Sequence, residues 1–333
     1  MKKRVRAGES VLKQLWLLNQ INSDLQRVEK ELTKFVETDY PILQDSAVHL
    51  LSAGGKRLRP AFTLLAGKFF SYSMDKLMPV AMALELIHMS SLVHDDVVDA
   101  SMTRRGRPTV KAKWGNIVSI ETGDYLFAKS LVLIARIDHP EVARILAEIS
   151  VEMCQGEIQQ IKSSFDVEQN LKQYYYRIKR KTALLISACC KLGAIVSDAP
   201  RRQVWALGAY GHSLGMAFQI VDDVLDITAK PSEFGKPIGG DLRQGIMTLP
   251  MILALKLSSE PAQLKTLLGK MDKTDDEVAE TIGLIKATGA IDQSMRLVDL
   301  YVKKAKKHLL DLPTISTRKA LEDLAEFIRV RKF

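Results

Sequence analysis

The stretch LELIHMSSLVHDDVVD, residues 84–99, predicts a buried helix and indicates the chemistry of this chain. Its apolar residues recur at helical spacing and lead into three aspartates, Asp95, Asp96 and Asp99. On a helix, Asp95 and Asp99 lie on one face because they are four residues apart, whereas Asp96 is turned about 100° away from Asp95. Stacked carboxylates repel each other unless a cation lies between them, and their hard oxygens suit Mg²⁺. The alternative is an acidic helix end exposed to solvent, although negative charge there opposes the helix dipole.

A second stretch, FQIVDDVLD at residues 218–226, repeats this pattern at the end of another apolar run, with Asp222, Asp223 and Asp226. Six aspartates that end two core helices are hard to explain as a means of solubility. If the two helices face each other, their carboxylates would line one cavity able to hold several Mg²⁺ ions against a diphosphate.

The composition favours helices throughout. Of 333 residues, 47% are hydrophobic and 26% charged, which excludes a disordered protein, while 19 glycines, 11 prolines and 6% aromatic residues give little support to a sandwich or barrel with many tight turns. We therefore predict an all-α fold. Helical patterns cover residues 12–40, 60–70, 79–99 and 116–137, with Pro60, Pro79 and Pro250 predicted at helix starts and the polar stretch 271–277 predicted as a connection.

No Pro/Gly/Ser-rich linker divides the sequence, so we predict one domain over residues 21–333, preceded by a basic segment at residues 1–20. No window reaches the 18 or so consecutive apolar residues of a membrane span, and the basic start is not followed by a signal-peptide core. A cytoplasmic protein is expected.

The cysteines and the net charge limit the kinds of site and of binding partner to be expected. Cys154, Cys189 and Cys190 form no CxxC pair, so they indicate neither a disulfide framework nor a zinc site and are expected to be small buried apolar residues. The net charge of +9 fits nucleic acid, a membrane surface or anionic small substrates. Because no nucleic-acid-binding signature accompanies the charge, nucleic acid is disfavoured.

Positive charge gathers in short clusters near predicted turns. These clusters are GGKRLRP at residues 54–60, TRRGRPT at 103–109, Arg180-Lys181-Thr182, and Gly235-Lys236-Pro237. Arginine forks match phosphate oxygens and lysine serves as a mobile point charge. Each cluster alone is more typical of a solvated loop, but together with two acidic motifs they indicate a diphosphate site.

In this order, these segments resemble the trans-type polyprenyl diphosphate synthases. The resemblance spans roughly residues 20–330 and rests on GGKRLRP, DDVVD followed by RRGRPT, the KT pair, FQIVDDVLD, and GKPIGGDL with a later TLP. It is strongest to the catalytic large subunits of two-component family members that make heptaprenyl diphosphate. It implies an isoprenoid-synthase-like helical bundle around a deep central cavity. The implied reaction adds isopentenyl diphosphate successively onto an allylic diphosphate, expected to be farnesyl diphosphate, to give an all-trans product, expected to be heptaprenyl, for a quinone side chain.

The resemblance also implies a role for each site residue. Three Mg²⁺ ions per active site are expected, with Asp95, Asp99 and Asp222 as principal ligands and Asp96, Asp223 and Asp226 in support. Lys56, Arg59, His88 and Arg105 would hold isopentenyl diphosphate. Arg104, Lys181, Thr182, Gln219 and Lys236 would address the allylic diphosphate, with Lys181 also counted as catalytic. One position departs from the family, because Ile246 stands where a lysine is frequent.

Two features of the first motif bear on the substrate. His88 has two readings, a satisfied core histidine or a substrate ligand, of which the resemblance favours the second. The apolar run 80–93 could keep water from a reactive cation. Ser90 and Ser91 stand where farnesyl-making relatives place aromatics, which predicts an open passage for a longer chain.

Several alternatives stay open. Glu85 and His88 form a Glu-x-x-His pair, but a di-iron bundle needs two such pairs. A terpene cyclase would need Ser/Thr and then Glu at four-residue steps after Asp222, where this chain has Asp226 and Lys230. A non-catalytic regulatory subunit has no need to keep both acidic motifs.

The expected partners are a small regulatory subunit (component I), a second copy of the chain, or both. Contact with the membrane is expected only transiently, for product release. The main alternative is a self-sufficient homodimeric synthase of another chain length.

Overall fold

The structure, a computed structural model, describes residues 20–55, 57–229 and 238–330. Within these ranges it is almost entirely helical, which confirms the predicted all-α class. The only strands in the described part of the chain are Thr103–Arg104 (β1) and Arg107–Pro108 (β2), which pair antiparallel as a short hairpin.

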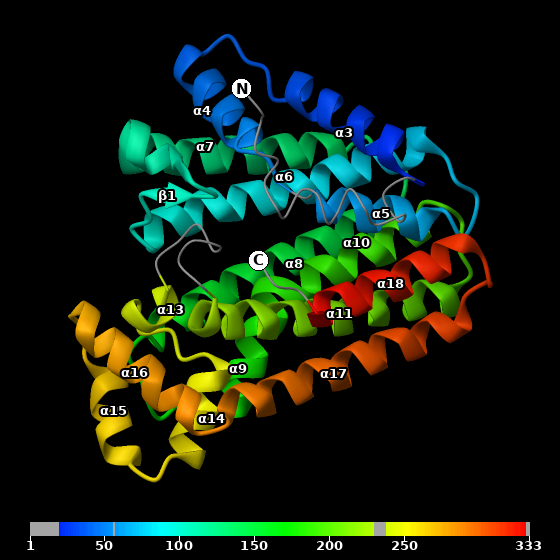
Figure 1. Ribbon diagram of the computed structural model, residues 1–333. Helices are drawn as coiled ribbons and strands as arrows, with labels where there is room; N and C mark the ends of the chain where they lie inside the picture. Colours follow the sequence, from blue (N-terminus) through cyan, green and yellow to red (C-terminus); the bar gives the residue numbers. More distant parts are fainter. Residues whose placement is uncertain (1–19, 56, 230–237, 331–333) are drawn as a thin grey trace, which may run out of the picture. The chain divides into compact units, whose positions relative to one another are not determined.

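Helices of different lengths follow one another along the chain, as labelled in Figure 1. They are α3 Asn22–Phe35, α4 Pro41–Ser52, α5 Leu58–Gly67, α6 Met74–Val98, α7 Val110–Ile134, α8 Pro140–Lys162, α9 Leu171–Ile178, the π-helix η1 Lys179–Ala183, α10 Leu184–Ile195, α11 Arg201–Thr228, α13 Gly240–Arg243, α14 Leu249–Leu257, α15 Pro261–Gly269, α16 Asp275–Ala287, α17 Ala290–His308, the 3₁₀-helix η2 Leu309–Asp311, and α18 Ser316–Val330.

The chain forms two compact units. Unit 1 comprises residues 1–148, 185–209 and 308–323, and unit 2 comprises residues 149–184, 210–307 and 324–333. The first acidic motif belongs to unit 1 and the second to unit 2. The single domain over residues 21–333 stays a prediction, and all but the last residue of the basic segment 1–20 lies outside the described residues.

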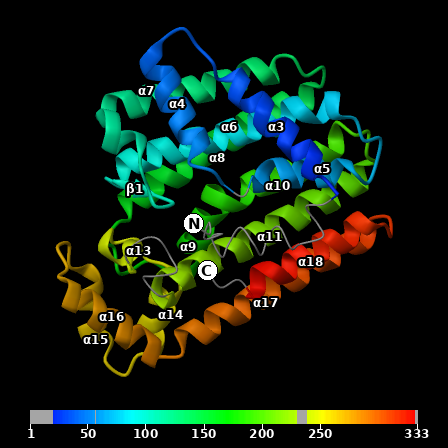
Figure 2. The same cartoon turned by 45° about the horizontal axis from the view of Figure 1, so that its top comes forward.

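Helix α6 is the core of unit 1. It is long and apolar enough to cross a membrane, but 67% of its most apolar window is buried inside the protein, as in the core helix of a soluble fold. It runs beside α7, with α4 and α5 packed next to this pair (Figures 1 and 2). Helices α5 and α10 approach closely, since a Cβ on Gly193 would lie only 2.2 Å from the carbonyl oxygen of Thr63. A side chain at that glycine would force the two helices apart.

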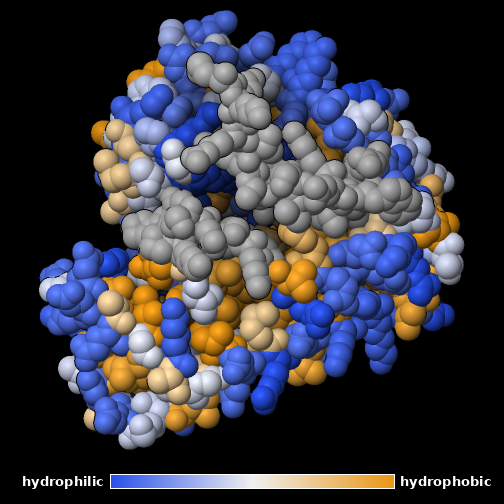
Figure 3. All heavy atoms as spheres, viewed as in Figure 1, coloured by the Kyte–Doolittle hydropathy of each residue, from blue (hydrophilic) through white to orange (hydrophobic). Residues whose placement is uncertain are grey.

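Unit 2 contains the second motif on α11. Tyr174 and Tyr210 are its largest fully buried side chains. A Cβ on Gly215 would lie 2.6 Å from the Cα of Ala183, so α11 packs directly on the π-helix η1. In Figure 3 the viewed surface of unit 2 shows apolar atoms around α14 and α16, whereas in unit 1 the atoms over α3 and α4 are mostly hydrophilic.

Several boundaries differ from the predictions. Helix α6 begins at Met74, so Pro79 lies inside it rather than at its start, and the burial of the surrounding helix outweighs the one lost hydrogen bond. The predicted connection 271–277 is wrong in its second half, because Thr274 and Glu277 form a capping box that starts α16 at Asp275. Helix α7 contains a break at Gly115 (φ 83°), directly before the predicted start at residue 116.

The three cysteines also differ in burial. Cys189 and Cys190 are buried on α10 as predicted, but Cys154 on α8 is exposed, so the prediction of a buried residue there is wrong.

Candidate active site

The first acidic motif closes helix α6. Asp95 lies in its last turn and Asp99 caps its C-terminus, where the Asp99 N–H donates to the Asp95 carbonyl at 2.8 Å. Both side chains are half-buried, whereas Asp96 is 2% exposed. The helix therefore presents Asp95 and Asp99 differently from Asp96, as their spacing predicts.

Asp96 fixes the β1–β2 hairpin. Its Oδ1 accepts a hydrogen bond from Nε of Arg104 at 2.8 Å and forms an ion pair with Nη2 of the same guanidinium, also at 2.8 Å. A charge-assisted bond to a buried carboxylate is stronger than a neutral one. Arg104, predicted to address the allylic diphosphate, is thus held by Asp96 in this structure.

A basic pocket lies beside this pair in unit 1. Its lining includes Arg57, Glu85, His88, Asp96, Arg104 and Arg105. Burial lowers the pKa of His88 well below its usual range, and the charges of four arginines lower that pKa further. Burial also lowers the pKa of Arg105, in the same sense as its arginine neighbours. The imidazole is therefore neutral, and the pocket carries excess positive charge suited to an anion such as diphosphate.

The second acidic motif lies within α11 and is more deeply buried. Asp222 is half-buried, whereas Asp223 and Asp226 are 3% and 7% exposed. A chain of hydrogen bonds runs through Asp223. Thr182 Oγ1 donates to Gln219 Oε1 at 2.6 Å, and Gln219 Nε2 donates to Asp223 Oδ1 at 2.9 Å.

Tyr174 completes this chain, because its hydroxyl donates to Asp223 Oδ2 at 2.6 Å. Two predicted allylic-site residues, Thr182 and Gln219, are therefore coupled to one predicted metal-site carboxylate. The network holds the start of the acidic motif from one side.

Asp226 holds the other end of the motif. Its carboxylate accepts the backbone N–H groups of Gly240 and Asp241 at 3.0 and 3.1 Å, which ties α11 to the start of α13. Burial and the nearby Asp241 carboxylate raise the pKa of both Asp223 and Asp226. The crowded negative charge is unfavourable by itself, which is the environment that a bound cation relieves.

Lys181 extends from the π-helix η1 of the same unit. Its Nζ lies 3.0 Å from Glu157 Oε2 and 3.3 Å from Gln160 Oε1, both on α8. π-helical turns are frequent at functional sites. The side chain of Lys181 is 29% exposed, which leaves it within reach of an anion.

The predicted residues thus form two groups, one in each unit. Unit 1 brings together Arg59, His88, Arg104 and Arg105 with Asp95, Asp96 and Asp99, and unit 2 brings together Lys181, Thr182 and Gln219 with Asp222, Asp223 and Asp226. Lys56 and Lys236 lie outside the described residues. That both motifs line one cavity stays a prediction.

Some residues that contact the site belong to no sequence motif and could not be recognised from the sequence. Tyr174 and Glu157 lie in helical patterns of ordinary appearance, and only the folded contacts relate them to Asp223 and Lys181. Glu85, considered above with His88 as half of a di-iron ligand set, forms an ion pair with Arg57 instead, with Oε1 3.0 Å from Nη1.

The donor set fits a hard divalent cation. Both motifs supply carboxylate oxygens, the ligands that Mg²⁺ prefers. Among the described residues, no three Asp, Glu, His or Cys side chains converge closely enough to enclose an ion. Diphosphate oxygens and water would therefore complete any metal shell, as is usual for Mg²⁺.

Residues 40–285 match the family model described as polyprenyl synthetase. The chain belongs to the polyprenyl synthetase family. This membership confirms the predicted family and shows the protein to be a prenyltransferase enzyme.

Individual family members support the same assignment. The chain is 48% identical to heptaprenyl diphosphate synthase component 2 of Bacillus subtilis, over 94% of this chain and 89% of that protein. It superposes on the crystal structure of heptaprenyl diphosphate synthase from Staphylococcus aureus with a TM-score of 0.89 and 36% identity, covering 93% of this chain and 98% of that one. The structure of polyprenyl synthase from Caulobacter crescentus, complexed with calcium and isoprenyl diphosphate, gives a TM-score of 0.91 at 35% identity, covering 95% and 97% of the two chains.

Proposed function

We propose that this trans-prenyltransferase adds isopentenyl diphosphate repeatedly to farnesyl diphosphate to make heptaprenyl diphosphate for a quinone side chain. The observation that carries the product length is the 48% identity to component 2 of a heptaprenyl synthase over 94% of the chain. Both acidic motifs are intact on buried helices, which argues against a regulatory subunit that has lost its chemistry.

Each group of side chains has a defined task in this proposal. In unit 1, Arg59 and Arg105 bind the diphosphate of isopentenyl diphosphate, and neutral His88 offers it a hydrogen bond without added charge. In unit 2, Lys181 exchanges its contact with Glu157 for the allylic diphosphate and stabilises it as the C–O bond ionises. The alkene then attacks the allylic cation, and loss of a proton completes the step.

We propose three Mg²⁺ ions for the complete site, held by Asp95, Asp99 and Asp222 with diphosphate oxygens. When bound, the ions supply positive charge against the departing diphosphate. The carboxylate donors and the crowding around Asp223 and Asp226 support this choice of cation. Calcium in the complex of the Caulobacter relative supports the use of a divalent ion.

We further propose that the chain acts with a small regulatory subunit, since the Bacillus relative is named as a second component. Exposed apolar residues on α7 support association with another chain, because Ile117, Ile120, Leu131 and Val132 are 44–78% exposed. A self-sufficient homodimer is the competing arrangement. We place the reaction in the cytoplasm, with membrane contact limited to product release.

Product chromatography tests the function directly. The purified chain is incubated with farnesyl and isopentenyl diphosphates and Mg²⁺, alone and with a co-expressed small subunit from the same source. Heptaprenyl diphosphate formed only with the subunit is the expected result. Full long-chain synthesis by the chain alone would instead establish the homodimeric enzyme.

Substitution of the acidic motifs tests the metal assignment. Asp95→Ala and Asp222→Ala are each expected to lower turnover by several orders of magnitude without changing helix content. Asp272→Ala, at an exposed position outside both motifs, is the matched control and should keep full turnover. Substantial activity in chelator or in either motif variant would contradict the assignment.

A further inference from the structure

Arg57 lies between two residues assigned to isopentenyl diphosphate, Lys56 and Arg59, yet it has no assigned role. Its backbone is in the left-handed region, with φ 46° and ψ 40°, at the N-cap of α5. A residue with a side chain rarely adopts this conformation, and outside glycine it persists only where surrounding contacts hold it.

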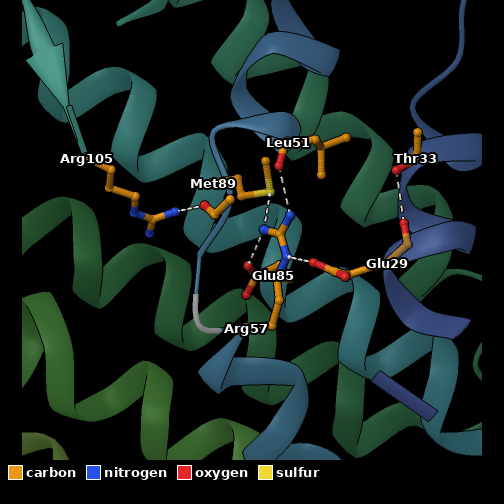
Figure 4. A network of polar contacts seen from close by, with 8 residues as sticks. Glu29, Thr33, Leu51, Arg57, Glu85, Met89 and Arg105 are labelled. Atoms are coloured by element: carbon orange, nitrogen blue, oxygen red, sulfur yellow. Dashed lines mark hydrogen bonds and ion pairs between the residues drawn. The ribbon is translucent and has the colours of Figure 1, made fainter. Parts of the chain in front are cut away.

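The side chain of Arg57 supplies these contacts (Figure 4). Nη1 donates to Glu85 Oε1 at 3.0 Å, Nε to Glu29 Oε1 at 3.1 Å, and Nη2 to the carbonyl oxygen of Leu51 at 3.0 Å. The guanidinium thus bridges α3, the last turn of α4 and the centre of α6. The side chain of Arg57 is 10% exposed and that of Glu85 is 4% exposed, so the central ion pair is buried.

These contacts connect the two ends of the α4–α5 loop, which lies between Ser52 and Leu58. Leu51 lies just before the loop and Arg57 at its end, and the guanidinium of Arg57 binds the carbonyl oxygen of Leu51. A second arginine acts in the middle, where Nη1 of Arg105 donates to the carbonyl oxygen of Gly54 (Figure 4). A Cβ on Gly55 would lie 2.6 Å from that same Nη1, so a side chain there would displace the arginine.

The pairing of charges separates Arg57 from Arg59. The two most buried carboxylates of this region each neutralise one arginine, with Glu85 opposite Arg57 and Asp96 opposite Arg104. Arg59 differs, because its Nε is buried without a hydrogen-bond partner among the described residues. The buried Nε of Arg59 is therefore available to a ligand, whereas each guanidinium nitrogen of Arg57 already donates a hydrogen bond.

We propose that Arg57 is a positioning residue whose ion pair with Glu85 holds the start of α5 so that Arg59 meets isopentenyl diphosphate. This inference rests on the proposed function for the identity of the ligand. It assigns Arg57 no contact with substrate and no part in the chemistry.

The test compares Arg57→Gly with Arg57→Lys. Glycine accepts the left-handed backbone without strain but removes the guanidinium, so it isolates the role of the side chain. Lysine can reach one partner but cannot bridge three. For Arg57→Gly we expect KM for isopentenyl diphosphate to rise roughly tenfold or more, with KM for the allylic substrate and kcat changed less than about twofold. Arg57→Lys should fall between this variant and the wild type.

Removing Arg57 alone leaves Glu85 buried and unpaired, which could prevent folding. The double variant Arg57→Gly/Glu85→Gln removes both charges and should fold, with an effect on KM no larger than that of Arg57→Gly alone. Lys306→Gln, which breaks an exposed ion pair with Glu326, is the matched control and should leave both KM values unchanged.

Amide hydrogen exchange without substrate separates this inference from the proposed function. In the double variant, exchange in residues 57–63 should accelerate about tenfold, while exchange in α17 stays the same. Failure of the wild type to bind isopentenyl diphosphate would overturn the proposed function but leave the exchange result to decide the role of Arg57. Unchanged exchange would overturn the inference, and a KM effect with unchanged exchange would show that Arg57 is a direct ligand.

Discussion

Stability of the protein should depend on pH through His88. In the folded protein its pKa is well below the ordinary value of 6.5 because the ring is buried, with Arg59, Arg105, Arg104 and Arg57 adding repulsion. In the unfolded chain the ring protonates near pH 6.5. Below that pH the unfolded state binds one more proton than the folded state, so folding stability falls as the pH falls and is fully present above pH 6.5.

The size of this effect follows from linkage. With a folded pKa far below the range studied, the loss of stability at pH 5.5 relative to pH 7.5 is about 1.4 kcal/mol, with a limiting slope of about 1.4 kcal/mol per pH unit. Urea unfolding of the wild type and of His88→Gln at pH 7.5, 6.5 and 5.5 measures it. Because both proteins share every other titrating group, the difference between their unfolding free energies isolates His88.

As the pH is lowered from 7.5 to 5.5, we expect the unfolding free energy of the glutamine variant to rise by this amount relative to that of the wild type. The carboxylates near the ring, Glu85 and Asp96, are paired with arginines and are common to both proteins. A wild-type-minus-variant difference that is the same at pH 7.5 and 5.5 would refute a buried neutral histidine. A difference that grows in the opposite sense would mean that the ring is charged in the folded state.

Three further predictions test the roles assigned to residues in the two units. Tyr174→Phe should cost about 1.5–3 kcal/mol in urea unfolding, because it removes a hydrogen bond to buried Asp223, and a cost below about 0.5 kcal/mol would show that this bond is not formed. Arg59→Gln should raise KM for isopentenyl diphosphate roughly tenfold to a hundredfold more than KM for the allylic substrate. Lys181→Gln should instead raise KM for the allylic substrate more. Equal effects of either variant on both KM values would contradict separate diphosphate sites. Ser91→Phe, at a half-buried position on α6, should shorten the product seen by chromatography without stopping the first condensation, and an unchanged product would exclude α6 as a wall of the chain passage.

The long helices could be predicted because their signals are local. Apolar spacing placed α6 and α11 along the chain, and the four-residue step between Asp95 and Asp99 correctly separated them from Asp96. Pro79 misled the prediction because proline marks helix starts on average, whereas here the burial of α6 outweighs its local cost.

Contacts between distant segments were beyond the reach of local patterns. Arg57 resembles any basic loop residue until Glu29 and Glu85, both 28 residues away, are brought to its guanidinium. Tyr174 is similarly related to Asp223 only by the fold, since 49 residues separate them. Periodicity reports which face of a helix is buried but not which side chain it meets there.

The π-helix η1 limits where related chains can gain or lose a residue. The N–H of Leu184 donates to the carbonyl of Lys179, five residues back, so this turn holds one residue more than an α-turn. That residue acts as a phase shift between α9 and α10, since its deletion would rotate every side chain on one side by about 100° relative to the other. Surface loops absorb insertions and deletions by changing their path, but a turn packed against Gly215 cannot. Relatives that keep the Lys-Thr pair should therefore conserve the number of residues in this segment more strictly than the residues themselves.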